Sequence, residues 1–143
     1  MLQVCLNGAH NRDECPALPI TPAERARAAR GAVAAGARVV VADPGAQRFR
    51  TRTGRLPVLR IPAEVTDTDP DSAAGTAVRL LDEIAGSRFP VLPGEDGGAW
   101  PVLRLALRRG LDTRIGLEDT LRLPDGSIAA DNAALVRVAV ATG

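Results

Sequence analysis

The chain has 143 residues, of which 45% are hydrophobic and 24% charged, a balance typical of one soluble globular domain with its own core. All 18 basic residues are arginine and the net charge is only +1, which excludes a strong general attraction to nucleic acid. No apolar run approaches the ~18 residues of a membrane span, and the first residues lack the pattern of a signal peptide. We therefore expect a cytoplasmic protein that does not interact with membranes. Cys5 and Cys15 have neither a metal-binding nor a redox spacing, which predicts two free thiols.

The first part of the chain has the pattern of a strand, a helix and a second strand. Residues 2–8 and 38–42 are short apolar runs typical of strands. Between them, Thr21 is followed by Pro22 and then by Glu24, the arrangement of a helix start with a capping box. The helical pattern ends at Gly36.

The second part repeats this alternation. Strands are expected at 57–65, 89–93 and 113–117, and helices from 69 to 86, from 99 to 110 and from 131 to 142. Pro62 inside the first of these strands indicates a bulge or a sheet edge. Trp100 is expected in the core between helix and sheet, and Asp131 at the start of the last helix is expected to cap it.

Strands that alternate with helices predict an α/β fold with a parallel sheet. The helix that should connect strand 38–42 to strand 57–65 is missing, and an arginine-rich stretch takes its place: Arg48, Arg50, Arg52 and Arg55. This stretch could hold a phosphate, including that of coenzyme A, although charge runs more often form a solvated loop. Five strands and four helices are too few for an eight-stranded barrel, which needs ~250 residues. We therefore expect one domain over residues 1–143 with a seam near 43–56.

Polar side chains follow the carboxyl ends of the expected strands: Asn7, Asp43, Glu64, Glu95, Asp96, Glu118 and Asp119. Because these ends meet at one edge of a parallel sheet, the acids would form a negatively charged pocket that suits a divalent cation or a cationic substrate. For Asp96 and Asp119, capping of a following helix is an equal alternative, whereas the position of Glu64 favours a site role. The glycine-rich residues 93–98 could bind a phosphate, but Glu95 and Asp96 would repel an anion.

Four stretches of the sequence resemble the β-keto acid cleavage enzyme family, which includes the 3-keto-5-aminohexanoate cleavage proteins. They are LQVCLNGAHNRDECPALPITPAE, RIPAEVTDTDPD, GEDGGAWPVLRLALRRGLDTRIGLEDTL and LPDGSIAADNAALV, of which the third, residues 94–121, is the most specific. Family members resemble zinc-dependent (β/α)8 TIM barrels of about twice this length. The resemblance implies a partial barrel in which the first two strands are joined directly to the last three and the middle strands are missing.

The resemblance also implies a Claisen-type exchange, in which a β-keto acid and acetyl-CoA give acetoacetate and a new acyl-CoA. Zinc would polarise the oxygens of the keto acid. The family's glutamate ligand corresponds to Glu64, and the arginine four residues earlier, which positions catalytic groups, corresponds to Arg60. An acid often follows that glutamate, but Val65 does so here. Asn7 and Glu118, at the ends of the first and last strands, are the expected substrate-binding residues.

The His-x-His metal motif of the family is missing. At its place the sequence reads Val41-Ala42-Asp43-Pro44; an equally good alignment assigns this stretch to a middle strand and deletes the second strand altogether. Asp43 could occupy the position of a metal ligand, but one carboxylate cannot replace two imidazoles. The simplest interpretation is that Asp43 has no functional role. The only histidine, His10, lies in a loop after the first strand, a position more typical of a surface residue than of a ligand.

Two hypotheses follow. The chain is an enzyme of this family, with a β-keto acid and acetyl-CoA as small-molecule partners and catalysis impaired by the loss of the metal motif. Alternatively, it is a non-catalytic truncated relative that serves assembly or ligand binding. A barrel without its middle strands has open edges, near 38–42 and at either 113–117 or 57–65, which predicts a homo-oligomer.

Overall fold

Strands and helices alternate along the chain as the sequence predicts. The computed structural model describes residues 1–8, 10–41, 61–84 and 90–143. Over these residues the strands are β1 (Leu2–Cys5), β2 (Val39–Val41), β3 (Ile61–Pro62), β4 (Pro90–Leu92) and β5 (Asp112–Arg114). The helices are α1 (Pro22–Ala34), α2 (Ala73–Glu83), α3 (Ala99–Arg108) and α4 (Asn132–Thr142), with a 3-10 turn at Asp96–Gly98 before α3.

The described strands form one parallel sheet in the order β2-β1-β5-β4-β3. β1 therefore has the second strand of the chain on one side and the last strand on the other. A ring of eight parallel strands that lacked its third, fourth and fifth members would keep this order. The expected α/β fold with the character of a partial (β/α)8 barrel is confirmed.

The sheet order also decides where the edges lie. Within the described residues the outer strands are β2 and β3, and β5 is central. Of the two alternatives for the second edge, the structure selects the stretch 57–65, of which residues 57–60 lie outside the described ranges. Pro62 belongs to this outer strand, as its missing N–H donor predicts.

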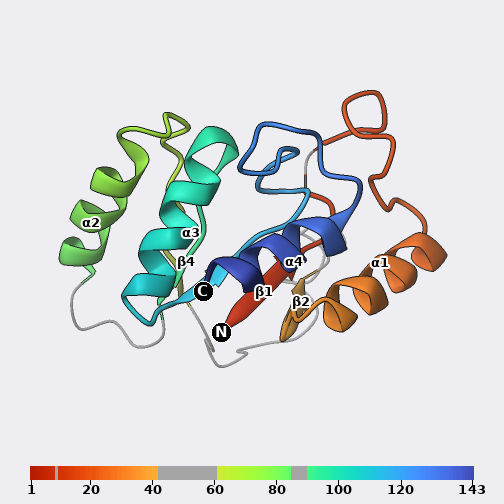
Figure 1. Cartoon of the computed structure of the whole chain (residues 1–143), viewed down its shortest axis with the longest axis horizontal. Coiled ribbons are helices and arrows are strands. Elements are labelled where there is room, and N and C mark those ends of the chain that lie inside the picture. The colour runs from red at the N-terminus through yellow and green to blue at the C-terminus, as the bar shows by residue number, and fades with distance from the viewer. Residues whose placement is uncertain (9, 42–60, 85–89) are drawn as a thin grey trace, which may run out of the picture.

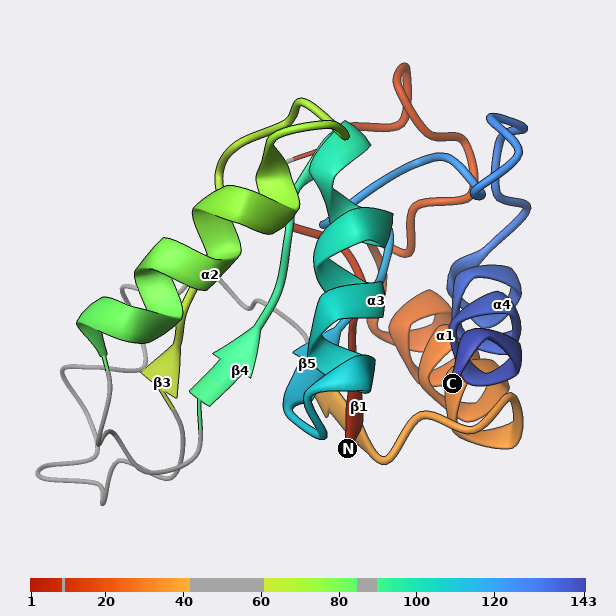
Figure 2. The same ribbon diagram turned by 60° about the vertical axis from the view of Figure 1, so that its left-hand side comes forward.

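All four helices cover one face of the sheet, with α1 beside α4 and α2 beside α3 (Figure 1; Figure 2). Under the first pair the core contains Val4, Leu6, Ile115 and Leu117 together with side chains of α1 and α4. A second core cluster joins Val65 and Leu92 to α2 and α3. Because side chains alternate along a strand, the residues between these core positions project from the opposite face of the sheet.

Local signals near the helix ends are confirmed with one correction. Thr21 accepts a hydrogen bond from the amide of Glu24, whose side chain accepts one in return from Thr21, and Asp131 accepts one from Ala134. The expected helix start at residue 69 is wrong, because α2 begins at Ala73. The reason is Asp67, whose carboxylate accepts hydrogen bonds from the Asp69 amide, the Ser72 hydroxyl and the Thr76 hydroxyl and so organises the preceding residues as a turn.

The predictions for Trp100 and for the two cysteines are confirmed. Trp100 is 6% exposed and packs in the core, with its indole N–H donating to the carbonyl of Arg122 at 2.8 Å. Cys5 and Cys15 are both buried and free. Among the described helices, none has the length and apolar character needed to cross a membrane.

Candidate functional site

The guanidinium of Arg114 lies among three carboxylates at the carboxyl edge of the sheet. Its Nε donates to Asp119 Oδ1 at 2.8 Å, and its Nη2 donates to Glu64 Oε1 at 2.9 Å. Nη2 also lies 2.6 Å from Asp119 Oδ1 and 3.6 Å from Glu118 Oε1. We call Arg114, Glu64, Glu118 and Asp119 the Arg114 cluster.

Two separate stretches of backbone bring the cluster together, the end of β5 with the turn that follows it and the residues after β3. Arg114 is the last residue of β5, and Glu118 and Asp119 follow in a turn whose amides at Asp119 and Thr120 donate to the carbonyl of Gly116. Glu64 follows β3, and its neighbours Ala63 and Val65 donate to backbone carbonyls of the β4 region. The outer strand of the sheet is thereby linked to the central one through side chains.

The carboxylate of Asp119 is the most enclosed member of the cluster. Its side chain has no exposed area, and its Oδ2 atom has no hydrogen-bond partner within the part of the chain that the structure describes. Burial raises the pKa of Asp119 to about 7, although the charge of Arg114 acts in the opposite direction. Burial alone would lower the pKa of Arg114, but Asp119 outweighs it and raises that pKa, so the guanidinium stays charged.

β1 contributes a thiol and an amide beside the cluster. The thiol of Cys5 donates to Glu118 Oε2, and burial together with this carboxylate raises the pKa of the thiol, which stays protonated. Asn7 is 8% exposed, and its Oδ1 accepts no hydrogen bond from residues 1–8, 10–41, 61–84 or 90–143. Since Leu6 packs in the helix-side core, Asn7 lies on the same face of the sheet as Cys5.

Gly8 leaves room for the contact of Cys5 in β1 with Glu118 in the turn after β5. Gly8 has φ +62°, and a Cβ there would overlap the side chain of Glu118. Both the left-handed backbone and the close approach therefore require glycine at this position.

The acids after β4 extend the negative edge without joining the cluster. Burial and the charges of Glu64 and Asp96 raise the pKa of Glu95. The side chain of Asp96 does not cap α3, whose N-cap is Gly98 without a side-chain hydrogen bond. The backbone amide of Asp96 instead donates to the carbonyl of Asp119 at 2.7 Å, which joins the two loops.

The structure thus brings Asn7, Glu64 and Glu118 to one edge, as the strand ends predict. Asp43 and Arg60 lie outside the described residues, as does the arginine-rich stretch 48–55. Arg114, which the sequence analysis did not place at this edge, lies among the acids expected to form a negatively charged pocket. The sequence analysis also missed Cys5. The alternation of side chains along β1 and β5 could have identified it, because residues 3, 5, 7 and 114 project from the face of the sheet that does not carry the core residues Val4, Leu6 and Ile115.

The described residues do not fit a zinc ion. They contain no group of three or more His, Cys, Asp and Glu side chains placed to hold a metal. His10, the only histidine of the chain, has its Nδ1 3.1 Å from Glu14 Oε2 in a loop. The Cys5 thiol is protonated, and Glu64 Oε1 accepts a hydrogen bond at 2.9 Å from the Arg114 guanidinium, whose positive charge would repel a nearby cation.

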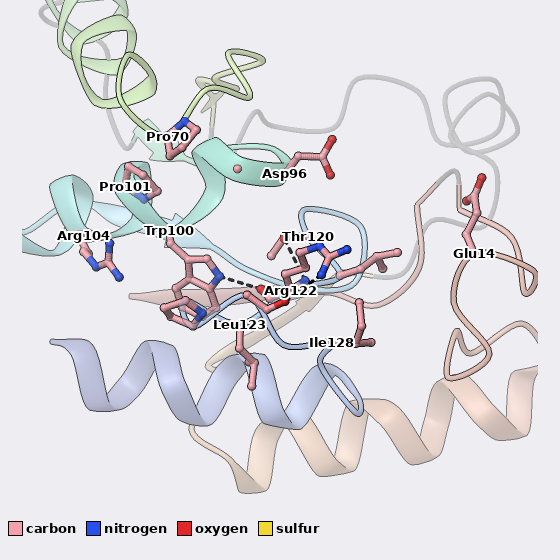
Figure 3. A pocket seen from close by; sticks show the side chains of 14 residues that line it. Glu14, Pro70, Asp96, Trp100, Pro101, Arg104, Thr120, Arg122, Leu123 and Ile128 are labelled. Carbon is pink, nitrogen blue, oxygen red and sulfur yellow. Dashed lines mark hydrogen bonds between the residues drawn. The ribbon is translucent and has the colours of Figure 1, made fainter.

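A cleft of about 690 Å³ lies between the start of α3 and the loop at 120–128 (Figure 3). Trp100 and Pro101 line it from the helix, and Leu123 and Ile128 from the loop. The guanidinium of Arg122 donates to the carbonyl of Gly126 at 2.8 Å and holds the loop closed on itself. None of the lining residues belongs to the Arg114 cluster.

Comparison with known proteins identifies a family. A family model described as beta-keto acid cleavage enzyme matches residues 1–48 and 69–143. These segments contain Asn7, Asp43 and Glu118, but the gap between them contains Arg60 and Glu64. None of the curated proteins matches the chain.

Proposed function

Because the chain belongs to the β-keto acid cleavage enzyme family, we propose that it is a relative in which the zinc-assisted exchange is lost or strongly impaired. In that exchange a β-keto acid, such as 3-keto-5-aminohexanoate, and acetyl-CoA become acetoacetate and a new acyl-CoA. We also propose that the chain still binds a small keto acid at the same edge of the sheet.

The observation that carries this proposal is the state of Glu64. This carboxylate is the counterpart of the family's glutamate ligand by the resemblance of RIPAEV, and it accepts from Arg114 at 2.9 Å. The chain has one histidine in total, so no pair of imidazoles can join it. Without a Lewis acid, the enolate that develops in the exchange loses a stabilising interaction of several kcal/mol.

Asn7 and Glu118 support retained binding. Glu118 belongs to the Arg114 cluster, and Asn7 lies on the same face of the sheet as Cys5, whose thiol donates to Glu118. The amide and the carboxylate could hold polar groups of a small molecule such as a β-keto acid. Acetyl-CoA as a second ligand and a cytoplasmic location remain expectations from the resemblance and from the sequence.

Metal analysis is the most direct test. Protein dialysed against metal-free buffer is expected to retain far less than one zinc per chain, because two of three family ligands are absent. A value close to one would overturn the proposal, and the Glu64→Gln variant would then show whether this residue is a ligand.

A coupled assay tests the reaction itself. Acetoacetate formation from 3-keto-5-aminohexanoate and acetyl-CoA is expected at the level of a protein-free control. Turnover that depends on the protein and disappears in Arg60→Ala, but persists in the matched Arg52→Ala variant, would mean that the chain is an active enzyme.

The strand order favours assembly as a second candidate function. The outer strands β2 and β3 are those whose neighbours would be missing from a ring of eight. Val41 at the end of β2 is 37% exposed, as expected for an apolar strand that pairs with another chain. Light scattering is expected to find a dimer or a larger species, and a monodisperse monomer with a cooperative melt would exclude this role.

A further inference from the structure

We propose that Arg114 is a built-in counter-ion, which holds the carboxylates of Glu64, Glu118 and Asp119 in place of a bound cation and keeps divalent metals out. Removal of its guanidinium should convert this edge of the sheet into a divalent-cation site. The inference rests on the proposed function, since it explains how the edge persists without zinc.

The charges of the cluster require such a counter-ion. Three carboxylates surround one guanidinium, with Nη2 between 2.6 and 3.6 Å from an oxygen of each. The Arg114 side chain is only 14% exposed, so water screens these charges poorly. Without the guanidinium, the carboxylates would repel one another in a partly buried place and would need another positive charge.

Two oxygen atoms that lack partners point to the same chemistry. Asp119 Oδ2 and Asn7 Oδ1 are both buried and have no hydrogen-bond partner among the described residues, and Asn7 as a whole is more than nine-tenths buried. Both are acceptors, and buried acceptors are normally satisfied by a donor or a cation. Carboxylate and amide oxygens are the donors that hard divalent cations prefer.

Calcium is the appropriate probe. It accepts six to eight oxygens in irregular geometry, whereas magnesium demands a regular octahedron and zinc prefers nitrogen and sulfur. Oxygens that are arranged around a planar guanidinium are not preformed for any metal, so the most adaptable cation should respond first.

The experiment compares melting temperatures with calcium chloride and with EDTA for the full chain and its variants. Wild type is expected to show no shift. Arg114→Met should melt lower in EDTA and recover by about 3–5 °C in millimolar calcium, the size expected when a ligand binds only the folded state. Arg114→Lys, which keeps the charge, should show no calcium response. Arg122→Met is the matched control, because its guanidinium donates to a carbonyl and to no described carboxylate.

A calcium response in Arg114→Met that is absent from Arg114→Lys and Arg122→Met would support the proposal. If Arg114→Met does not fold, Arg114→Met with Asp119→Asn removes the most buried charge and should still respond to calcium through Glu64 and Glu118. A folded variant of either kind without a response would overturn the proposal, as would equal responses in all variants. Such a failure leaves the proposed function intact, since that function fails only if wild type itself retains zinc or turns over substrate.

Discussion

Two arginine–carboxylate pairs of this protein have nearly the same length and opposite consequences. Arg12 and Glu24 meet at 2.5 Å on the surface before α1, and Arg114 and Asp119 meet at 2.6 Å inside the sheet edge. The pKa of Glu24 is lowered to about 2, by the Thr21 amide and then by Arg12, whereas burial raises the pKa of Asp119 to about 7. The distance between nitrogen and oxygen therefore does not decide what such an ion pair contributes to stability. The exclusion of water from around the pair decides it.

Glu24 and Asp119 also differ in how many hydrogen-bond donors stabilise the ionised carboxylate. Glu24 has three donors, from Thr21, Ile20 and Arg12, and each of its bonds stabilises the ionised form. The side chain of Asp119 is fully buried, and its Oδ2 atom accepts no hydrogen bond from the described residues. We expect the exposed pair to contribute little and the buried pair to be costly to break.

The largest effect is expected from Asp119→Ala. This change leaves Arg114 partly buried with only the more exposed carboxylates, and breaking a buried pair costs about 3–5 kcal/mol. Urea denaturation at pH 7 should show this loss. Asp119→Asn is the control that keeps the shape and an acceptor for Nε, and it should cost clearly less. Equal losses for both would mean that charge is not what matters.

Gly116→Ala should come next. A Cβ at Gly116 would overlap the backbone of Cys5 on the neighbouring strand, and backbone cannot move aside as a flexible side chain can. Overpacking of this kind costs about 1–3 kcal/mol. Gly126→Ala, at a loop glycine with no atom within 4 Å of a new Cβ but with φ +85°, separates backbone strain from overlap. If the two glycines cost the same, close approach between β1 and β5 is not the reason.

A smaller effect is expected from Thr21→Ala, which removes the side-chain acceptor of the capping box. The cost of losing such a cap is about 1 kcal/mol. Arg12→Ala should cost less than Thr21→Ala, since it removes only an exposed ion pair. An Arg12→Ala loss as large as that of Asp119→Ala would contradict the comparison.

The two carboxylates should also give opposite pH dependences. The folded pKa of Glu24 is lowered, so its contribution is present above about pH 4.5 and disappears as the pH falls toward 2. The folded pKa of Asp119 is raised, so its contribution to stability declines as the pH rises from about 4 to 7. Chemical denaturation across this range measures the free energy of unfolding at each pH. Glu24→Gln should remove only the loss of stability between about pH 4.5 and 2, and Asp119→Asn should remove only the loss between about pH 4 and 7.

By itself, the sequence determined the features that depend on neighbours along the chain. The capping box of Thr21 and Glu24, the Asp131 cap and the alternation of strands with helices all arise within a few residues. The gathering of Asn7, Glu64 and Glu118 also followed from the sequence, because parallel strands place their carboxyl ends at one edge.

Only the tertiary structure decided which charges meet at that edge. Arg114 lies fifty positions from Glu64, and Cys5 lies 113 positions from Glu118. No local pattern encodes these contacts, because they depend on the order β2-β1-β5-β4-β3, which places the first and last strands side by side. The sign of the Asp119 pKa shift follows from the same packing, since an ionised carboxylate is penalised only where the fold excludes water from it.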